Sequence, residues 1–229
     1  VIKKNYLKFE DEIKLKEYVE KKGGIYMSTP FSLEAAIKLN EIGVSLFKIG
    51  SGECNNYPLI EKISKFKKPI ILSTGMNNLK SIQESVKILE KNKIQYVLMH
   101  CISEYPVPND HLKLDHIIEL KNKFPKALIG YSDHSIGITP AIIAMSKGAC
   151  IIEKHFTDTK KRSGPDIICS MDPLDLKNIY EASKVVNISR GIKTKITKTE
   201  KITAKFAFAS VVTIKAIKKE ERLNKKNIW

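Results

Sequence analysis

The sequence predicts an α/β fold, a TIM (β/α)8 barrel that is incomplete in this chain. Short runs rich in β-branched and apolar residues alternate with helical patterns, which indicates a parallel sheet. Polar side chains gather at the carboxyl ends of these runs, where such barrels carry their chemistry. The predicted strands are residues 25–29, 45–51, 70–75, 96–101, 127–133 and 151–156.

The helices between these strands are predicted from caps and from apolar spacing. Residues 10–22 form a charged helix before the first strand, and a second helix follows Ser32 and ends at Gly43, a left-handed cap. Asp172 and Pro173 begin a later helix as its N-cap and first residue. Apolar side chains also recur at helical spacing. These stripes are Ile82, Val86 and Leu89; Leu114, Ile117 and Ile118; and Leu176, Ile179, Ala182 and Val186.

Six βα units are visible where a closed barrel needs eight. An open doubly wound sheet accommodates six strands without loss, so it is the alternative fold. After Arg190 the composition changes to a lysine- and threonine-rich stretch with a short apolar core at residues 206–212. We therefore predict a partial barrel over residues 1–190, then a linker and the start of a second domain over residues 191–229.

The composition is typical of a soluble cytoplasmic protein. No apolar run approaches the roughly 20 residues that a membrane helix needs. The four cysteines are far apart and form no CxxC pair, which argues against a disulfide framework or a thiolate zinc site. The net charge of +15 comes mostly from lysines rather than from arginine, the residue that base recognition favours. We therefore expect no nucleic-acid or membrane partner, and a few cations in a pocket for an anionic ligand.

Six sequence motifs, taken in order, resemble the N-acetylneuraminate (sialic acid) synthase family over nearly the whole chain. One such string alone is weak evidence, but six in the same order, with similarity between them, are specific. The tail from AKFAFASVV onward resembles the family's linker and the opening of its antifreeze-like (SAF) domain. The motifs are KIGSGECNNYPLI (48–60), ILSTGM (71–76), HC-x-x-x-YPVP (100–108), GYSDHS (130–135), EKHFTD (153–158) and GPDIICSMDP (164–173).

The resemblance implies a barrel enzyme that condenses phosphoenolpyruvate with N-acetylmannosamine, using a divalent metal, Mn²⁺ or Mg²⁺, and releasing phosphate. It also implies a domain-swapped homodimer in which each antifreeze-like domain covers the partner's active site. The sugar stays open, because precursors of legionaminate, pseudaminate or a spore-coat polysaccharide are acceptors within the same family. The further alternatives are an inactive fragment and a basic binding protein without catalysis.

The matched motifs also imply the roles of individual residues. His134 and His155 match the family's metal ligands, and imidazoles at the ends of consecutive strands can converge on one rim. Glu53 and Asp166 match acidic residues that are assigned to proton transfer and positioning. Lys48 lies in an apolar strand, where an unpaired charge is costly, so a bound anion explains it. The predicted phosphoenolpyruvate contacts are Lys48, Ser51, Ser73, Ser103, Tyr105 and Ser132.

Overall fold

The computed structural model describes residues 7–192 and 194–229. The chain divides into two compact units, Val1–Ile188 and Ser189–Trp229. The first unit holds one parallel sheet of five strands, and each strand pairs with the next one along the chain. The strands are β1 (Phe47–Ile49), β2 (Ile70–Ser73), β3 (Tyr96–Cys101), β4 (Leu128–Asp133) and β5 (Ile151–Lys154).

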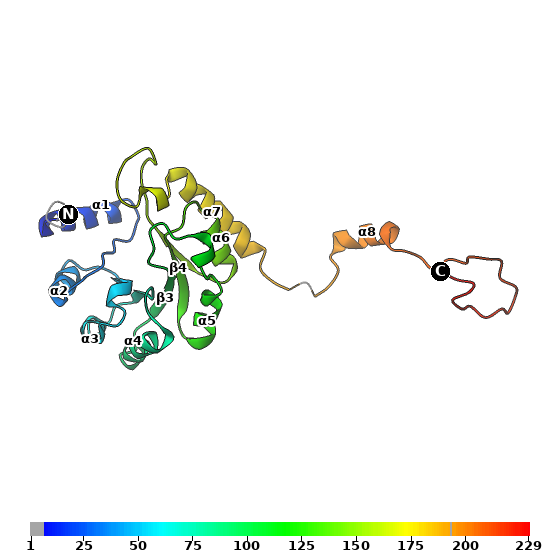
Figure 1. Cartoon of the computed structure of the whole chain (residues 1–229), viewed down its shortest axis with the longest axis horizontal. Helices are drawn as coiled ribbons and strands as arrows, with labels where there is room; N and C mark the ends of the chain where they lie inside the picture. The colour runs from blue at the N-terminus through cyan, green and yellow to red at the C-terminus, as the bar shows by residue number, and fades with distance from the viewer. Residues whose placement is uncertain (1–6, 193) are drawn as a thin grey trace. The chain divides into compact units, whose positions relative to one another are not determined.

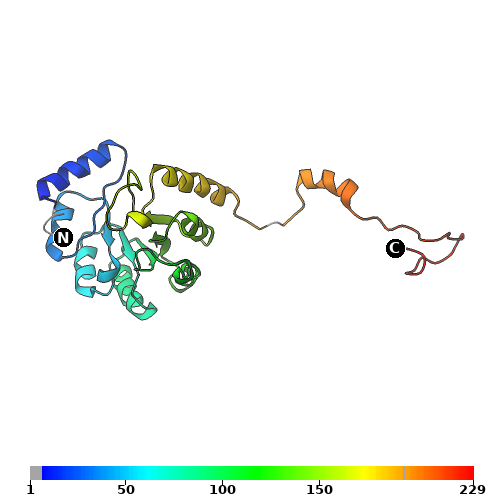
Figure 2. The same cartoon turned by 45° about the horizontal axis from the view of Figure 1, so that its top comes forward.

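Helices surround this sheet on its outer side, as the two views in Figures 1 and 2 show. Their starts follow the capping residues of the sequence: Ser32 Oγ accepts the backbone N–H of Ala35, and Asp172 Oδ1 accepts that of Asp175. The helices of the first unit are α1 (Phe9–Lys21), α2 (Leu33–Glu41), α3 (Tyr57–Ser64), α4 (Leu79–Lys91), α5 (His116–Lys123), α6 (Thr139–Ser146) and α7 (Pro173–Ile188). Short 3₁₀ turns are η2 (Ser51–Glu53), η3 (Asn109–His111) and η4 (Ile167–Cys169).

The order of the strands decides between the two predicted folds. In a doubly wound sheet the strand order reverses at one point, and helices cover both faces. Here the order β1-β2-β3-β4-β5 runs without reversal, as it does around a barrel. The first unit is therefore a parallel α/β half-barrel.

The predicted strand at residues 25–29 does not join the sheet, so the prediction of six strands was wrong by one. The segment runs near the end of β1, because a Cβ built on Gly50 would lie 3.6 Å from Thr29 Cγ2. Among the described residues, however, no backbone hydrogen bond joins it to β1. A segment at the edge has a neighbour on one side only, and Pro30 lacks the N–H that would extend a ladder.

Strand side chains alternate between two different environments. Toward the helices, Leu72, Leu98 and Ile129 belong to the main hydrophobic core. On the other side of the sheet, Ile71 and Val97 form part of a much smaller cluster. We call this second side the inner side of the half-barrel. Most of the polar residues predicted for the site lie on it.

The predicted helix stripes are only partly buried. The α4 stripe of Ile82, Val86 and Leu89 is buried as expected. In α5, Ile117 and Leu120 lie one turn apart and are both buried. Ile118 therefore faces solvent and is 43% exposed. In α7, Ile179 is buried against α6, whereas Leu176 is 45% exposed. The predictions for Ile118 and Leu176 were therefore wrong, because each helix buries a narrower stripe than the sequence indicates.

The described residues of the second unit include the helix α8 (Lys198–Ala207), with a capping box at its start. Thr197 Oγ1 accepts the backbone N–H of Glu200, and the Glu200 carboxylate accepts that of Thr197. An isolated antiparallel bridge joins Thr213 to Ile228. In the described part of the chain, no helix combines the length and apolar character that crossing a membrane requires.

Candidate functional site

The predicted polar residues meet at the carboxyl ends of the strands, on the inner side of the sheet. The strand register places Ser73 beside Met99, and Cys101 beside Ser132, which in turn lies beside Glu153. Because side chains alternate along each strand, residues two positions apart share a side. The polar side chains on the inner side are Lys48, Ser73, Cys101, Ser132, His134, Glu153 and His155.

Lys48 is the charged centre of this group and is only 6% exposed. Its Nζ donates a hydrogen bond to Ser73 Oγ at 2.7 Å and lies 3.4 Å from Glu153 Oε2. Ser132 Oγ donates to the other Glu153 oxygen at 3.2 Å. The Glu153 side chain is 41% exposed, so it can turn toward water when an anion takes its place. An ammonium group bonded to one hydroxyl, with a second hydroxyl on its carboxylate partner, is a suitable binding site for a phosphate or carboxylate.

Two further serines surround Gly75, just beyond β2. The backbone N–H of Gly75 donates to Ser51 Oγ at 3.0 Å. A Cβ at Gly75 would lie 2.8 Å from Ser51 Oγ and 2.6 Å from Ser103 Oγ, so only glycine admits both hydroxyls at this distance. Cys101 Sγ lies 4.0 Å from Ser103 Oγ and 3.9 Å from His134 Nδ1, and so connects the serines with the histidines.

The two histidines lie side by side, with ring centroids 5.6 Å apart. The Tyr105 ring packs on both, 4.0 Å from His134 and 5.8 Å from His155. His134 Nδ1 is 2.8 Å from the carbonyl oxygen of Ile102, so Nδ1 carries a proton and donates it. Burial disfavours the charged ring, but contacts with Cys101 and this carbonyl outweigh it and raise the pKa of His134. Nε2 is left as the nitrogen that can bind a metal.

The donor set fits a divalent ion that keeps several open positions. In residues 7–192 and 194–229, no three histidine, cysteine, aspartate or glutamate side chains cluster closely enough to hold a metal ion by themselves. A closed zinc site would need four protein ligands. Two imidazoles would leave the other coordination positions to water and substrate oxygens, the ligands that Mn²⁺ and Mg²⁺ favour.

The two predicted carboxylates occupy different environments. Asp166 precedes η4 in a left-handed conformation with φ of 60°. Burial raises the pKa of the Tyr105 hydroxyl, and the charges of Cys101, Asp166 and Glu153 raise it further, so the Asp166 carboxylate acts electrostatically on Tyr105. The Glu53 carboxylate, in η2, accepts a hydrogen bond from Asn56 Nδ2 at 2.6 Å.

Three charged residues of this region were not among the predicted site residues: Glu153, Asp133 and Lys154. Glu153 contacts both Lys48 and Ser132, and Asp133 forms a buried ion pair with Lys154. The signal available in the sequence was the presence of charged residues inside the apolar runs ALIGYSD and IIEKHF. A charge in such a run needs a partner, but the sequence does not say which one.

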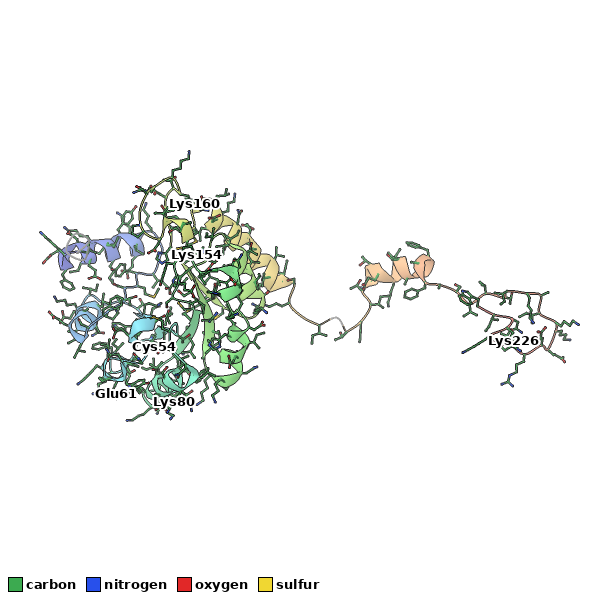
Figure 3. The ribbon with its side chains drawn as sticks, in the orientation of Figure 1. Cys54, Glu61, Lys80, Lys154, Lys160 and Lys226 are labelled. Atoms are coloured by element: carbon green, nitrogen blue, oxygen red, sulfur yellow. The ribbon has the colours of Figure 1, made fainter. Side chains whose placement is uncertain are left out.

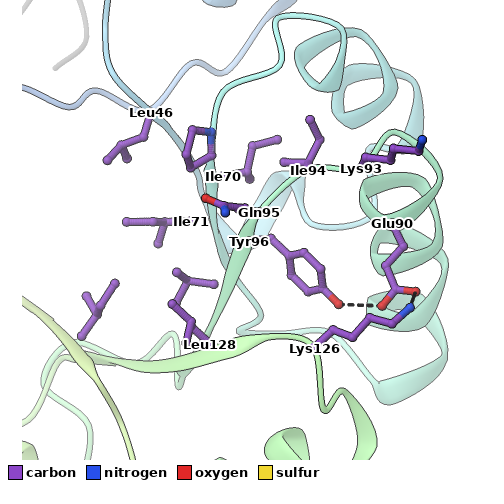
Figure 4. A pocket seen from close by; sticks show the side chains of 13 residues that line it. Leu46, Ile70, Ile71, Glu90, Lys93, Ile94, Gln95, Tyr96, Lys126 and Leu128 are labelled. Atoms are coloured by element: carbon purple, nitrogen blue, oxygen red, sulfur yellow. Dashed lines mark hydrogen bonds and ion pairs between the residues drawn. The ribbon is translucent and has the colours of Figure 1, made fainter.

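A hollow of about 540 Å³ lies at the opposite, amino end of the strands. Figure 4 shows its mostly apolar lining, which includes Leu46, Ile71 and Leu128. At its charged edge the Glu90 carboxylate accepts hydrogen bonds from the Tyr96 hydroxyl and from Lys126 Nζ. In barrels this end contributes stability rather than chemistry, so the carboxyl end is the candidate site.

The cysteines are expected to differ sharply in reactivity. Burial raises the pKa of the Cys54 thiol to about 12, whereas Cys150 is exposed. Because the thiolate is the nucleophile, iodoacetamide at pH 8 should modify Cys150 and spare Cys54 in the folded protein. Peptide mass spectrometry measures this, with urea-unfolded protein as the control in which both react. Equal labelling of both thiols in the folded chain would contradict the structure.

Comparison with known proteins gives consistent matches. The sequence profile of the NeuB family matches residues 1–195. An uncharacterized protein of Methanocaldococcus jannaschii is 42% identical over 221 residues, which cover 96% of this chain and 65% of that protein. The N,N'-diacetyllegionaminic acid synthase of Campylobacter jejuni is 42% identical over 208 residues, covering 89% of this chain and 62% of that enzyme. The chain thus spans less than two thirds of the length of these two relatives.

A solved structure agrees with these sequence matches. The N-acetylneuraminic acid synthetase of Leptospira borgpetersenii, crystallised with citrate, superposes with a TM-score of 0.80 at 33% identity. The superposition covers 87% of this chain and 70% of that one. The half-barrel is therefore similar to part of a sialic acid synthetase.

Proposed function

The chain belongs to the NeuB family, and on that premise we propose that it condenses phosphoenolpyruvate with an acetamido sugar, N-acetylmannosamine being the first candidate. The products are inorganic phosphate and a keto acid with three carbons more than the sugar. The main observation in support is that Lys48 and the two histidines occupy the same side and the same end of one sheet. One half of this site suits an anion, and the other half suits a metal and a sugar aldehyde.

Phosphoenolpyruvate binds at the lysine half of the site. Lys48 Nζ already lies 2.7 Å from Ser73 Oγ, so the ammonium and this hydroxyl are arranged before the substrate arrives. Binding exchanges the Glu153 carboxylate for the substrate's anionic groups, so Lys48 stays neutralised throughout. Ser132 is released from Glu153 at the same time, and Ser51 and Ser103 supply further donors.

The sugar aldehyde binds at the histidine half. A divalent ion held by His134 and His155, Mn²⁺ or Mg²⁺, would draw charge onto the aldehyde oxygen when bound. The Ile102 carbonyl fixes the tautomer of His134, and the Tyr105 ring restricts the rotation of both imidazoles. These contacts orient the two donor nitrogens before any ligand is present.

The reaction then needs one carbon–carbon bond, one water and one departing phosphate. C3 of the enolpyruvate attacks the aldehyde carbon, and the aldehyde oxygen takes a proton to become a hydroxyl. Water adds to C2, and Asp166, whose charge acts on the Tyr105 hydroxyl, orients it and accepts its proton. The C2 hydroxyl then forms the keto group as the C–O bond to phosphate breaks, its proton passes to the departing phosphate, and Lys48 balances the charge of that leaving group. Glu53 is the second candidate for the proton transfer.

A second acceptor is favoured by one comparison. Identity is 42% with the legionaminic acid synthase and 33% with the neuraminic acid synthetase. An acceptor with two acetamido groups in place of one is therefore the alternative substrate. The antifreeze-like domain, the domain-swapped homodimer and the cytoplasmic location stay predictions from the family resemblance.

The proposal is tested by product identification with a panel of sugars. The full chain is incubated with phosphoenolpyruvate, Mn²⁺ and one of three acceptors: N-acetylmannosamine, its 6-phosphate or a diacetamido hexose. Mass spectrometry should detect an acid three carbons longer than one of them, and reactions without sugar serve as the control. Absence of such a product with every acetamido sugar would rule out the synthase activity, whereas a product from the diacetamido sugar alone would select the second candidate.

A further inference from the structure

Behind the two histidines, on the helix side of the sheet, Asp133 and Lys154 form a buried ion pair. They are the last residues of β4 and β5 and lie opposite each other in the strand register. Lys154 Nζ is 2.9 Å from Asp133 Oδ2, and the two side chains are 1% and 0% exposed. Figure 3 shows Lys154 within the first unit.

The turn that contains His134 supplies further hydrogen bonds to both members of the ion pair. Asp133 Oδ1 accepts the backbone N–H of Ser135 at 2.9 Å and its hydroxyl at 2.6 Å. Lys154 Nζ also donates to the carbonyl oxygen of Ser135 at 2.7 Å. Tyr131 adds a hydroxyl donor to Asp133 Oδ1 at 3.2 Å. Both ions are therefore satisfied, and Ser135 is tied to each of them, so the backbone is fixed on either side of His134.

Each histidine follows one member of the pair by a single residue. His134 comes after Asp133, and His155 comes after Lys154. Because successive side chains alternate, the histidines point to the inner side while the ion pair lies on the helix side. The ion pair therefore adds a side-chain link between the two strand ends from which the imidazoles project, at the last pair of the β4–β5 ladder.

Stability alone does not account for such a pair. Desolvation of two buried charges offsets most of their attraction, and an apolar pair of similar size is often as stable or more so. An ion pair with fixed hydrogen bonds supplies geometry, because it sets both a distance and a direction. We propose that Asp133 and Lys154 are positioning residues that hold His134 and His155 at the separation a divalent ion requires. This inference rests on the metal site of the proposed function.

The test is a Mn²⁺ titration of the full chain and of the double variant Asp133→Asn/Lys154→Met. The double variant removes both charges together, so no lone charge is left buried, and the amide keeps an acceptor for Ser135. The electron paramagnetic resonance signal of free Mn²⁺ gives the affinity without any need for turnover. Loss of outer residues that orient metal ligands weakens binding by about 10- to 100-fold, and that is the expected rise in Kd. Circular dichroism checks that the variant is folded.

Two control variants separate positioning from general destabilisation. Leu89→Ala removes a fully buried side chain of α4 and should lower the melting temperature without changing the Mn²⁺ affinity. His134→Ala should remove specific binding. If the double variant binds Mn²⁺ with the same affinity as the parent, the positioning role is overturned, but the proposed metal site is not. If the parent chain binds no Mn²⁺ in a His134-dependent way, the metal site of the proposed function is wrong, and this inference is overturned with it.

A further variant covers the case in which the double variant does not fold. Lys154→Arg keeps the charge but displaces the donors that reach Asp133 and Ser135. We expect it to fold and to bind Mn²⁺ several-fold more weakly than the parent. Parent affinity in this variant would likewise overturn the positioning role.

Discussion

Replacing His134 or His155 by alanine is expected to abolish Mn²⁺ binding and to lower the rate of phosphate release by about a thousandfold, because a Lewis acid contributes several kcal/mol to the transition state. Either change leaves a single imidazole at the carboxyl end of the sheet, where the parent has two rings with centroids 5.6 Å apart. The measurements are Mn²⁺ titration and a phosphate assay at saturating phosphoenolpyruvate and sugar.

His111→Ala is the matched control for these histidine variants. His111 lies in η3, is exposed, and its Nδ1 is 3.0 Å from a Glu104 carboxylate oxygen, so its loss should alter neither the metal affinity nor the rate. The metal assignment would be contradicted if His134→Ala and His155→Ala both kept the parent Mn²⁺ affinity.

Lys48→Met is expected to have the second-largest effect, on phosphoenolpyruvate rather than on the metal. The change removes the buried ammonium that lies 2.7 Å from Ser73 Oγ, so the substrate's charge loses its principal partner. We expect a higher KM for phosphoenolpyruvate and a fall in kcat/KM of about 10²- to 10³-fold. Glu153 loses its cation but is 41% exposed, so water can solvate it and the fold should persist.

The control for this change is Lys65→Met, at the exposed C-terminal end of α3. It removes the same charge outside the site and should leave KM unchanged. Mn²⁺ affinity should also be unchanged in Lys48→Met, which separates the two halves of the site. A KM for phosphoenolpyruvate that is the same in the parent and in Lys48→Met would contradict the assignment of Lys48.

Much of the half-barrel could be predicted from the sequence, because apolar β-branched runs and capped helices are local signals. The run YVLMHC matches β3 residue for residue, and the α4 stripe is buried as its spacing indicates. Residues 25–29 were mispredicted because a strand also needs a hydrogen-bonded neighbour, and no backbone hydrogen bond joins this segment to β1 in the described part of the chain. That requirement is not local, and Pro30 opposes it.

Part of the candidate site was predictable because local sequence signals locate the carboxyl ends of the strands. Parallel strands end on one edge, so polar residues that close successive apolar runs are expected to meet, and Lys48, Ser73 and Ser132 do so through their contacts. The involvement of Glu153 and the pairing of Asp133 with Lys154 depend on the register between strands, which composition and spacing do not contain.

The measurement that tests the central claim most directly is phosphate release from phosphoenolpyruvate by the full chain, with and without an acetamido sugar and Mn²⁺. We expect release that requires both the sugar and the metal, that is lost in His134→Ala and in Lys48→Met, and that is kept in His111→Ala. Release that is independent of the sugar, or that persists in both site variants, would contradict a condensing site at the carboxyl ends of these strands.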